Sequence, residues 1–324
     1  MGEAELFPEF GSRVDTGPYR IGTSGFSFGD WVGPVYPQSL PKVKMLEYYE
    51  QTLGFDTVEL NYTYYSMPVP KTMESMVRRT RDDFLFVVRS HKDMTHDIWS
   101  DDKRRVLKDT SAAFSTFKEG IRPLRESGRL GCLLVQLPVY FWPVPDNFRY
   151  LRRMPELLPE VPLVVEFRNK SWVRDSTFRM LEESGMGYCV VDEPKLPRLV
   201  PFDPRRTSDI AYFRFHGRNQ NWFNASKEER YDYLYSRSEL GEFVGPIREV
   251  TKGAGKGGAG QSRNQKSETR SQKTEVGGKG RGRTFIFFNN CHAGSAARNA
   301  VMMKQMLDLV QELSPVQQRL EEGT

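Results

Sequence analysis

Acidic, basic and amide side chains follow short apolar runs at many points along this sequence. Glu166 and Arg168 end one such run, and Arg214 and His216 end another. An imidazole can take and give a proton near neutral pH, and a carboxylate can act as the alternative base. Guanidinium groups bind phosphate or carboxylate through paired hydrogen bonds. If the fold brings these residues together, they predict acid–base chemistry on a polar, anionic ligand.

The runs that must position these residues alternate with segments of helical periodicity. Eight strands are predicted, at residues 20–25, 57–62, 84–91, 131–137, 163–167, 188–192, 210–216 and 284–289. Helices are predicted between and after them, at residues 42–53, 71–79, 101–126, 146–157, 175–184, 227–250 and 293–313. Eight strand–helix units predict a single-domain α/β fold, a TIM-type (β/α)8 barrel, with its functional pocket at the C-terminal ends of the strands.

Alternation within each strand indicates which side chains meet inside the barrel. In residues 210–216, Phe213 and Phe215 lie on the face that packs against helices. Arg214 and His216 therefore point into the barrel. The same rule directs a further set of polar side chains inward: Glu59, Asn61, Arg89, His91, Gln136, Glu166, Arg168, Asp192 and Asn289 or Asn290.

From this set we expect Glu166, His216 and Asp192 to be catalytic. We expect substrate to be bound by Glu59, Asn61, Tyr64, Arg89, His91, Gln136, Arg168, Trp172, Arg214, Asn289 and Asn290. A structural interpretation stays open for each residue, since a buried ion pair can stabilise a barrel and aromatic residues can simply roof its mouth. Burying this many charges is costly unless they pair, hydrogen-bond or meet a ligand, which favours a functional pocket.

Composition excludes several classes of protein. No apolar stretch approaches the roughly 18 residues that a membrane span needs, and the N-terminus lacks the basic and apolar regions of a secretory signal. Three widely spaced cysteines argue against a disulfide framework or a zinc cluster. We therefore expect an intracellular, cytoplasmic protein with no membrane partner. The sequence does not specify its oligomeric state.

All of the basic excess lies in one segment. The chain has a formal charge of +5, and residues 251–282 contribute +6 through eight Lys or Arg and two acids, which leaves −1 for the rest. With nine glycines and no aliphatic residue larger than alanine except Val276, this segment is predicted to be a disordered insertion before the last strand. It is either a solvated spacer or a basic arm that contacts nucleic acid. The predicted domain is residues 19–313, with tails at 1–18 and 314–324.

Ordered motifs along the chain resemble those of the YecE-like family, catalogued as domain of unknown function 72. The matching stretches are Ile21-Gly-Thr-Ser-Gly-Phe with Trp31 and Tyr36-Pro37, Val58-Glu-Leu-Asn61 with Tyr64 and Tyr65, Thr95-His96, Gln136-Leu-Pro138, Glu166-Phe-Arg168 with Ser171-Trp172, Arg214-Phe-His-Gly217, Tyr231 to Tyr235, and Phe288-Asn-Asn290 with Asn299-Ala300. The resemblance implies a TIM-type barrel similar in shape to the xylose isomerase and endonuclease IV group, and it implies no established activity. The chain departs from the family pattern at Arg89, Asn169 and Cys291-His292, where the family often has Lys, His and Asp.

A metal site is one alternative that the comparison with barrel isomerases raises. In those enzymes carboxylates on strands five, six and eight and a histidine on strand seven can share a divalent ion. This chain offers Glu166, Asp192 and His216 in three of those places, which would suit Mg²⁺, Mn²⁺ or Zn²⁺, but an Asn replaces the final acid. The neighbouring Arg168 and Arg214 would oppose a cation. No cofactor is therefore certain.

Two functions remain open at this point. One is an enzyme that acts on a phosphorylated sugar or a nucleotide-like substrate by acid–base hydrolysis or isomerisation, with or without a metal. The other is a non-catalytic barrel that binds a small anionic or sugar-like ligand, or nucleic acid.

Overall fold

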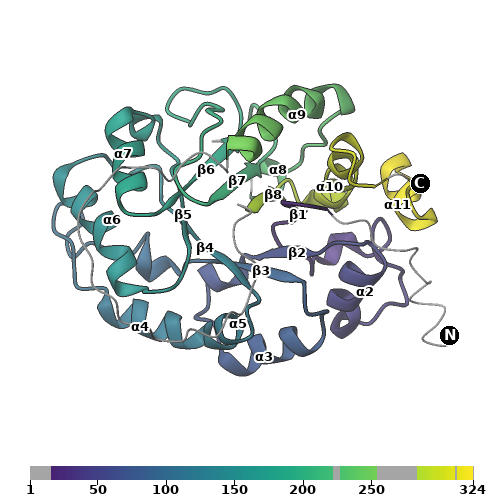
Figure 1. Cartoon of the computed structure of the whole chain (residues 1–324), viewed down its shortest axis with the longest axis horizontal. Helices are drawn as coiled ribbons and strands as arrows, with labels where there is room; N and C mark the ends of the chain where they lie inside the picture. Colours follow the sequence, from purple (N-terminus) through teal and green to yellow (C-terminus); the bar gives the residue numbers. More distant parts are fainter. Residues whose placement is uncertain (1–15, 222–226, 254–282, 311, 324) are drawn as a thin grey trace, which may run out of the picture.

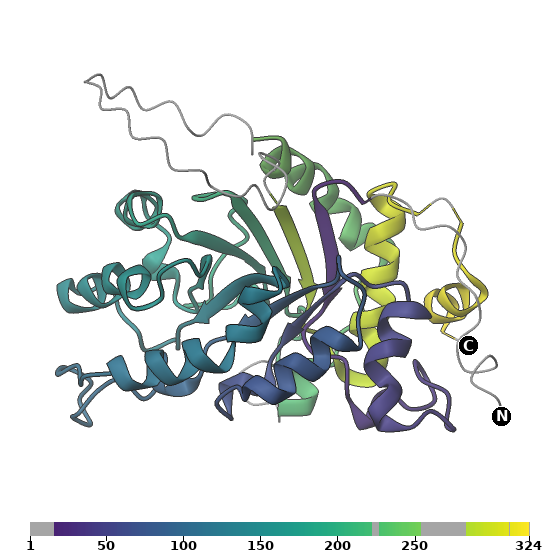
Figure 2. The same cartoon turned by 60° about the horizontal axis from the view of Figure 1, so that its bottom comes forward.

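Eight parallel strands wind into one barrel with helices around its outside (Figures 1 and 2). The computed structural model describes residues 16–221, 227–253, 283–310 and 312–323. The strands are β1 (Tyr19–Thr23), β2 (Thr57–Leu60), β3 (Leu85–Arg89), β4 (Leu130–Gln136), β5 (Leu163–Glu166), β6 (Gly187–Asp192), β7 (Ile210–Phe215) and β8 (Arg283–Phe288). Their order is β1-β8-β7-β6-β5-β4-β3-β2. The predicted TIM-type barrel is confirmed.

The helices follow the predicted segments with two interruptions, and the helix predicted at 293–313 ends early, at Met306. They are α2 (Met45–Gln51), α3 (Pro70–Arg78), α4 (Ser111–Gly120), α5 (Arg122–Glu126), α6 (Pro145–Leu157), α7 (Asp175–Glu183), α8 (Lys227–Arg230), α9 (Arg237–Lys252), α10 (Ser295–Met306) and α11 (Pro315–Glu322). The single helix predicted at 101–126 is wrong, because Asp101 accepts backbone N–H bonds in a loop and Pro123 separates α4 from α5. The helix predicted at 227–250 is also interrupted, and Ser236 caps the start of α9.

The segment predicted as a C-terminal tail forms α11. Ser314 and Gln317 make a capping box at its start, and Leu320 is buried. The Arg298 side chain on α10 donates to the Leu320 carbonyl, and Gln317 donates to the Leu53 carbonyl. These contacts fix α11 against the barrel. Most of the predicted N-terminal tail and residues 254–282 of the predicted insertion lie outside the described residues, whereas Thr251 and Lys252 end α9.

The join between β1 and β2 is closed by a side chain. An isolated parallel bridge joins Ser24, the residue after β1, to Glu59 on β2. The Tyr49 hydroxyl accepts the Thr23 N–H at 2.9 Å and donates to the Thr57 carbonyl at 3.1 Å. Gly22 allows this approach, because a Cβ there would lie 2.3 Å from the Thr57 carbonyl oxygen. Tyr49 therefore supplies the hydrogen bonds that a strand pair would make.

We expect Tyr49→Phe to lower the free energy of unfolding by about 1–3 kcal/mol, because it leaves a buried N–H and a buried carbonyl without a partner. Urea unfolding measures the change. Tyr65→Phe, at a ring that is 57% exposed, is the matched control. A Tyr49→Phe protein as stable as the control would mean that the join does not depend on this hydroxyl.

No helix in the described ranges is both long enough and apolar enough to cross a membrane.

Candidate functional site

A fully buried arginine holds the centre of the barrel mouth. Arg214 on β7 donates to Glu166 Oε2 at 2.5 Å and to Glu59 Oε1 at 2.6 Å. It also donates to Gln136 Oε1 at 3.1 Å. Both carboxylate side chains are 0% exposed. The ends of β2, β4, β5 and β7 thus meet at one guanidinium, and the three inward predictions for Glu59, Gln136 and Glu166 agree with their contacts.

Below this layer, aromatic rings fill the interior. The Tyr212 hydroxyl donates to Glu59 Oε2 at 2.6 Å, and its ring lies 6.0 Å and 5.5 Å from the rings of Phe285 and Phe287. Glu59 therefore has both oxygens in use, one with Arg214 and one with Tyr212. The barrel below the network is a packed core.

His216 lies inside the same network with both ring nitrogens in contact. Its Nε2 is 3.1 Å from Glu166 Oε1, and its Nδ1 is 3.0 Å from the amide nitrogen of Asn289. Because the amide nitrogen is a donor, the imidazole proton belongs on Nε2, where it donates to Glu166. Burial, then the charge of Arg168, lowers the pKa of His216 to about 3. The imidazole is therefore neutral, and it matches the structural interpretation better than the catalytic one.

Glu166 is a permanent carboxylate in this setting. Burial alone would raise its pKa, but Arg214, His216 and Arg168 together hold the pKa well below its ordinary value. Arg168 donates to Glu166 Oε1 at 3.1 Å and contacts His216 Nε2 at 3.3 Å. The side chain of Arg168 is 11% exposed, so it lies at the edge of the network next to solvent.

The inward prediction for Asp192 is wrong. Asp192 pairs in register with Phe215, which lies on the helix-facing side, so its side chain points the same way. Its carboxylate accepts hydrogen bonds from Arg218 at 3.0 Å and from the Tyr235 hydroxyl at 2.6 Å. The physical reason is that residues 188–191 are apolar on both faces, so alternation carries no signal there. Within the described residues, no three His, Cys, Asp or Glu side chains converge as metal ligands, and the predicted trio with Asp192 does not assemble.

A second acid, Glu193, also faces Arg168. It lies one residue beyond β6, and sequence reasoning missed it. Glu193 Oε2 lies 3.1 Å from Arg168 Nη2, and Oε1 accepts the Val200 N–H at 2.7 Å. Its side chain is 0% exposed. Burial raises the pKa of Glu193 to about 7 although Arg168 acts to lower it. The signal was the pair of consecutive acids, since one of two adjacent side chains on an extended segment must face inward.

Among the residues that the structure describes, none supplies a carboxylate within ion-pair distance of the Arg89 guanidinium. Its guanidinium carbon lies 4.2 Å from the centre of the Tyr64 ring, and its Nε is buried without a hydrogen-bond partner among the described residues. Burial, then the charge of Arg214, lowers its pKa. Glu166 and Glu59 are close enough to act on it electrostatically. Arg89 and Tyr64 therefore lie together at the mouth, and ligand binding by them stays a prediction.

Four other residues that were predicted to bind substrate make contacts within the protein instead. Trp172 is 1% exposed, stacks 4.7 Å from Phe167 and donates to the Phe141 carbonyl, so it has no face for a ligand and that prediction is corrected. Asn290 donates to the Asn299 side chain on α10. His91 Nδ1 accepts the Asp93 N–H within its own loop. Asn61 donates to the Ser24 carbonyl, and its side-chain oxygen is buried without a partner in the described part of the chain.

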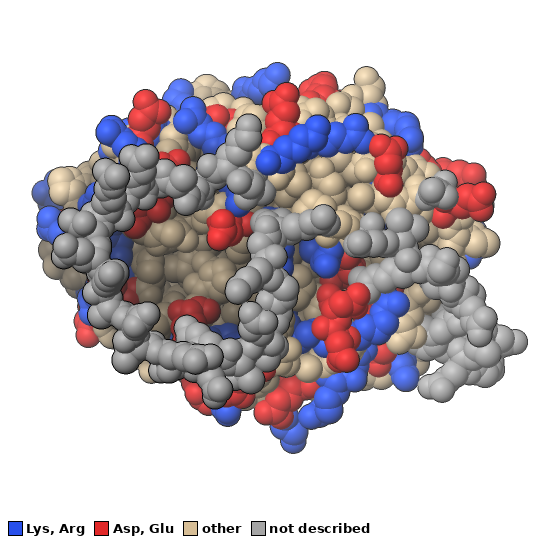
Figure 3. Space-filling view, viewed as in Figure 1, with Lys and Arg blue, Asp and Glu red and all other residues tan. Residues whose placement is uncertain are grey.

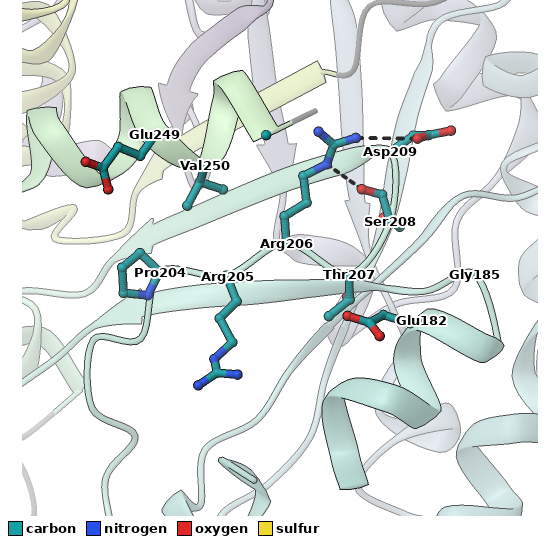
Figure 4. Close-up of a pocket in the computed structure, with 11 residues that line it drawn as sticks. Glu182, Gly185, Pro204, Arg205, Arg206, Thr207, Ser208, Asp209, Glu249 and Val250 are labelled. Atoms are coloured by element: carbon teal, nitrogen blue, oxygen red, sulfur yellow. Dashed lines mark hydrogen bonds and ion pairs between the residues drawn. The ribbon is translucent and has the colours of Figure 1, made fainter. Parts of the chain in front are cut away.

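A separate cavity of about 760 Å³ lies at the opposite end of the barrel, where β7 begins and α9 ends (Figure 4). Arg206 projects beside it and donates to the Ser208 carbonyl, with Asp209 at 3.4 Å. None of the predicted site residues lines this cavity. On the face shown in Figure 3, basic and acidic side chains are interspersed among the coloured residues, without a broad patch of one sign.

Comparisons with known proteins agree with this architecture. The family model described as "Protein of unknown function DUF72" matches residues 20–322. The chain is 28% identical over 305 residues to UPF0759 protein YunF of Bacillus subtilis, and the matched region covers 89% of this chain and 94% of that protein. It is 41% identical to a DUF72 family protein (TM1631) of Thermotoga maritima, with a TM-score of 0.75 over 90% of this chain and 99% of the other. A DUF72 family protein (EF0366) of Enterococcus faecalis shares the fold, with 24% identity and a TM-score of 0.71 over 92% and 98% of the two chains. The protein belongs to the DUF72 family.

Proposed function

We propose that this protein is an enzyme that acts on a small anionic, sugar-like substrate, such as a phosphorylated sugar or a nucleotide-like molecule, by acid–base hydrolysis or isomerisation. The pairing of charges at the mouth supports an anionic ligand. Arg214 is matched by Glu59 and Glu166, and Arg168 by Glu166 and Glu193. Arg89 has no such carboxylate within ion-pair distance among the described residues.

Arg89 is the observation that carries the proposal. Arg89 is half-buried and lies over the face of Tyr64, and its buried Nε meets no hydrogen-bond acceptor among the described residues. Withdrawing part of a guanidinium from water is costly unless an anion or hydrogen-bond acceptor meets it. A phosphate or carboxylate of a ligand would supply the missing acceptor through paired hydrogen bonds. The partly exposed Tyr64 ring beside Arg89 would contact the apolar face of a sugar.

A non-catalytic anion-binding barrel is the second candidate. It is favoured by the pairing of Glu166 with both Arg214 and His216, which is the pattern of a structural ion network. The enzyme and the non-catalytic barrel would both bind the ligand. Formation of product is therefore the measurement that separates them.

We expect Arg89→Gln to weaken binding of a sugar phosphate by about tenfold or more, because a charge-assisted hydrogen bond contributes roughly 1.5–3 kcal/mol. Isothermal titration with ribose 5-phosphate and glucose 6-phosphate measures it, and phosphorus NMR of the same mixtures reports product. Arg149→Gln, at an exposed arginine of α6, is the matched control. Binding that is unchanged in Arg89→Gln would remove the anion site, and binding without product would favour the non-catalytic barrel.

A further inference from the structure

His96 lies on the same wall of the mouth as Arg89. It follows the short 3-10 helix η4 (Lys92–Met94) after β3. Its ring meets the Tyr64 ring edge-on at 4.8 Å, and the Arg89 guanidinium lies over that same tyrosine at 4.2 Å. The Tyr140 ring, from the loop after β4, is 6.5 Å away. His96 is partly exposed, whereas His216 is 0% exposed.

The hydrogen bonds of His96 leave one nitrogen available. Its Nδ1 lies 2.9 Å from the Thr95 hydroxyl, which in turn donates to the His91 carbonyl at 3.4 Å. Because the hydroxyl proton goes to the carbonyl, Nδ1–H is the donor to Thr95 and the lone pair is on Nε2. Within the described ranges, Nε2 makes no hydrogen bond or ion pair. Thr95 therefore acts as a positioning residue for this ring.

We propose that His96 Nε2 takes a proton from a hydroxyl of the ligand whose anion is held by Arg89 and Arg168. This inference rests on the proposed function. In the step, the O–H bond breaks with its electron pair remaining on the ligand oxygen, an N–H bond forms, and the imidazolium later returns the proton to an oxygen of the product. Geometry selects His96 over His216, because both nitrogens of His216 are already engaged.

Burial and the charges around His96 keep the ring neutral, with a lone pair on one nitrogen. Burial, then Arg89, lowers its pKa to about 4, with Arg168 acting the same way and Asp97 acting against them. Tyr64, Tyr140 and Thr95 complete its surroundings. An anion that neutralises the two arginines removes part of the electrostatic cause. Ligand binding should therefore raise the pKa of His96 and make it a stronger base.

Carbethoxylation by diethyl pyrocarbonate tests this assignment, because the reagent acylates only neutral imidazole. At about pH 5.5 a histidine of ordinary pKa is roughly nine-tenths protonated and reacts about tenfold more slowly than at pH 7.5, whereas His96, with its pKa lowered to about 4, should keep most of its reactivity over that range. Peptide mass spectrometry locates the product. Saturating inorganic phosphate should slow the reaction at His96 several-fold in wild type, and Arg89→Gln should abolish that protection. An unreactive His96, or one that phosphate does not protect although titration shows phosphate bound, would overturn the inference while leaving the anion site intact.

Turnover of any substrate found by phosphorus NMR provides the second measurement. His96→Gln should lower kcat by about a hundredfold or more and leave the dissociation constant for inorganic phosphate within a few-fold of wild type. His292→Gln is the control and should leave both unchanged. A normal kcat in His96→Gln would show that the base lies elsewhere, and the proposed function would still stand on the product observed.

Discussion

Arg214→Met should lower the free energy of unfolding by about 3–5 kcal/mol, the range for breaking one partner out of a buried ion pair. The substitution leaves Glu59 and Glu166 facing each other at 0% exposure without the guanidinium between them. The loss should be smaller at low pH, where both carboxyls can be protonated, and larger above neutral pH. Urea unfolding across that pH range measures it, with Arg149→Met on α6 as the control.

The triple variant Glu59→Gln, Arg214→Met, Glu166→Gln separates the ion network from simple packing. Because it removes all three charges together, it should recover a large part of the stability that Arg214→Met loses. Equal stability of the single and triple variants would contradict the network interpretation. So would an Arg214→Met protein within about 1 kcal/mol of wild type, since a buried charge left unpaired cannot be that mild.

The sequence was sufficient for the strands and for most of the inward faces. Each predicted strand overlaps an observed one, because buried parallel strands are short apolar runs between helices. Faces were predicted well where one side of the run carries charge, as at Arg214 and Glu166. They failed at Asp192, where the preceding residues are apolar on both sides and the chain gives no sign of which face is inward.

Pairing between side chains could not be predicted from strand alternation. The rule places Glu166 and Arg168 at the mouth but cannot say that the Arg168 guanidinium spans Glu166 and Glu193. Nor does any pattern indicate that Arg218 and Tyr235 take the Asp192 carboxylate on the outer side. These choices depend on side-chain reach across elements that are distant in sequence. The same holds for Tyr49, whose hydroxyl lies between β1 and β2 only because the barrel closes there.

Glu193 should make the stability of the folded protein depend on pH. Its pKa is about 7 in the folded chain against 4.5 ordinarily, and burial is the main cause. Below about pH 4.5 the group is protonated in both states, so it has no effect on the difference between them. As the pH rises from there to about 7, the unfolded chain ionises first and the folded state loses relative stability. The full loss is about 3 kcal/mol, from roughly 1.4 kcal/mol per pK unit.

Glu193→Gln removes this dependence while keeping the shape of the side chain. Relative to the variant, wild type should lose stability steadily between about pH 4.5 and pH 7 and no further above that. Urea unfolding of both proteins over this range measures the difference, and Glu156→Gln at an exposed position of α6 gives the background. A difference that stays constant with pH, or that grows in favour of wild type as the pH rises, would mean that Arg168 holds Glu193 ionised. In that case Glu166 and Glu193 would both stay ionised beside Arg168 and neutralise it. Among the arginines of the mouth, Arg89 would then be the one whose positive charge could bind an anionic ligand.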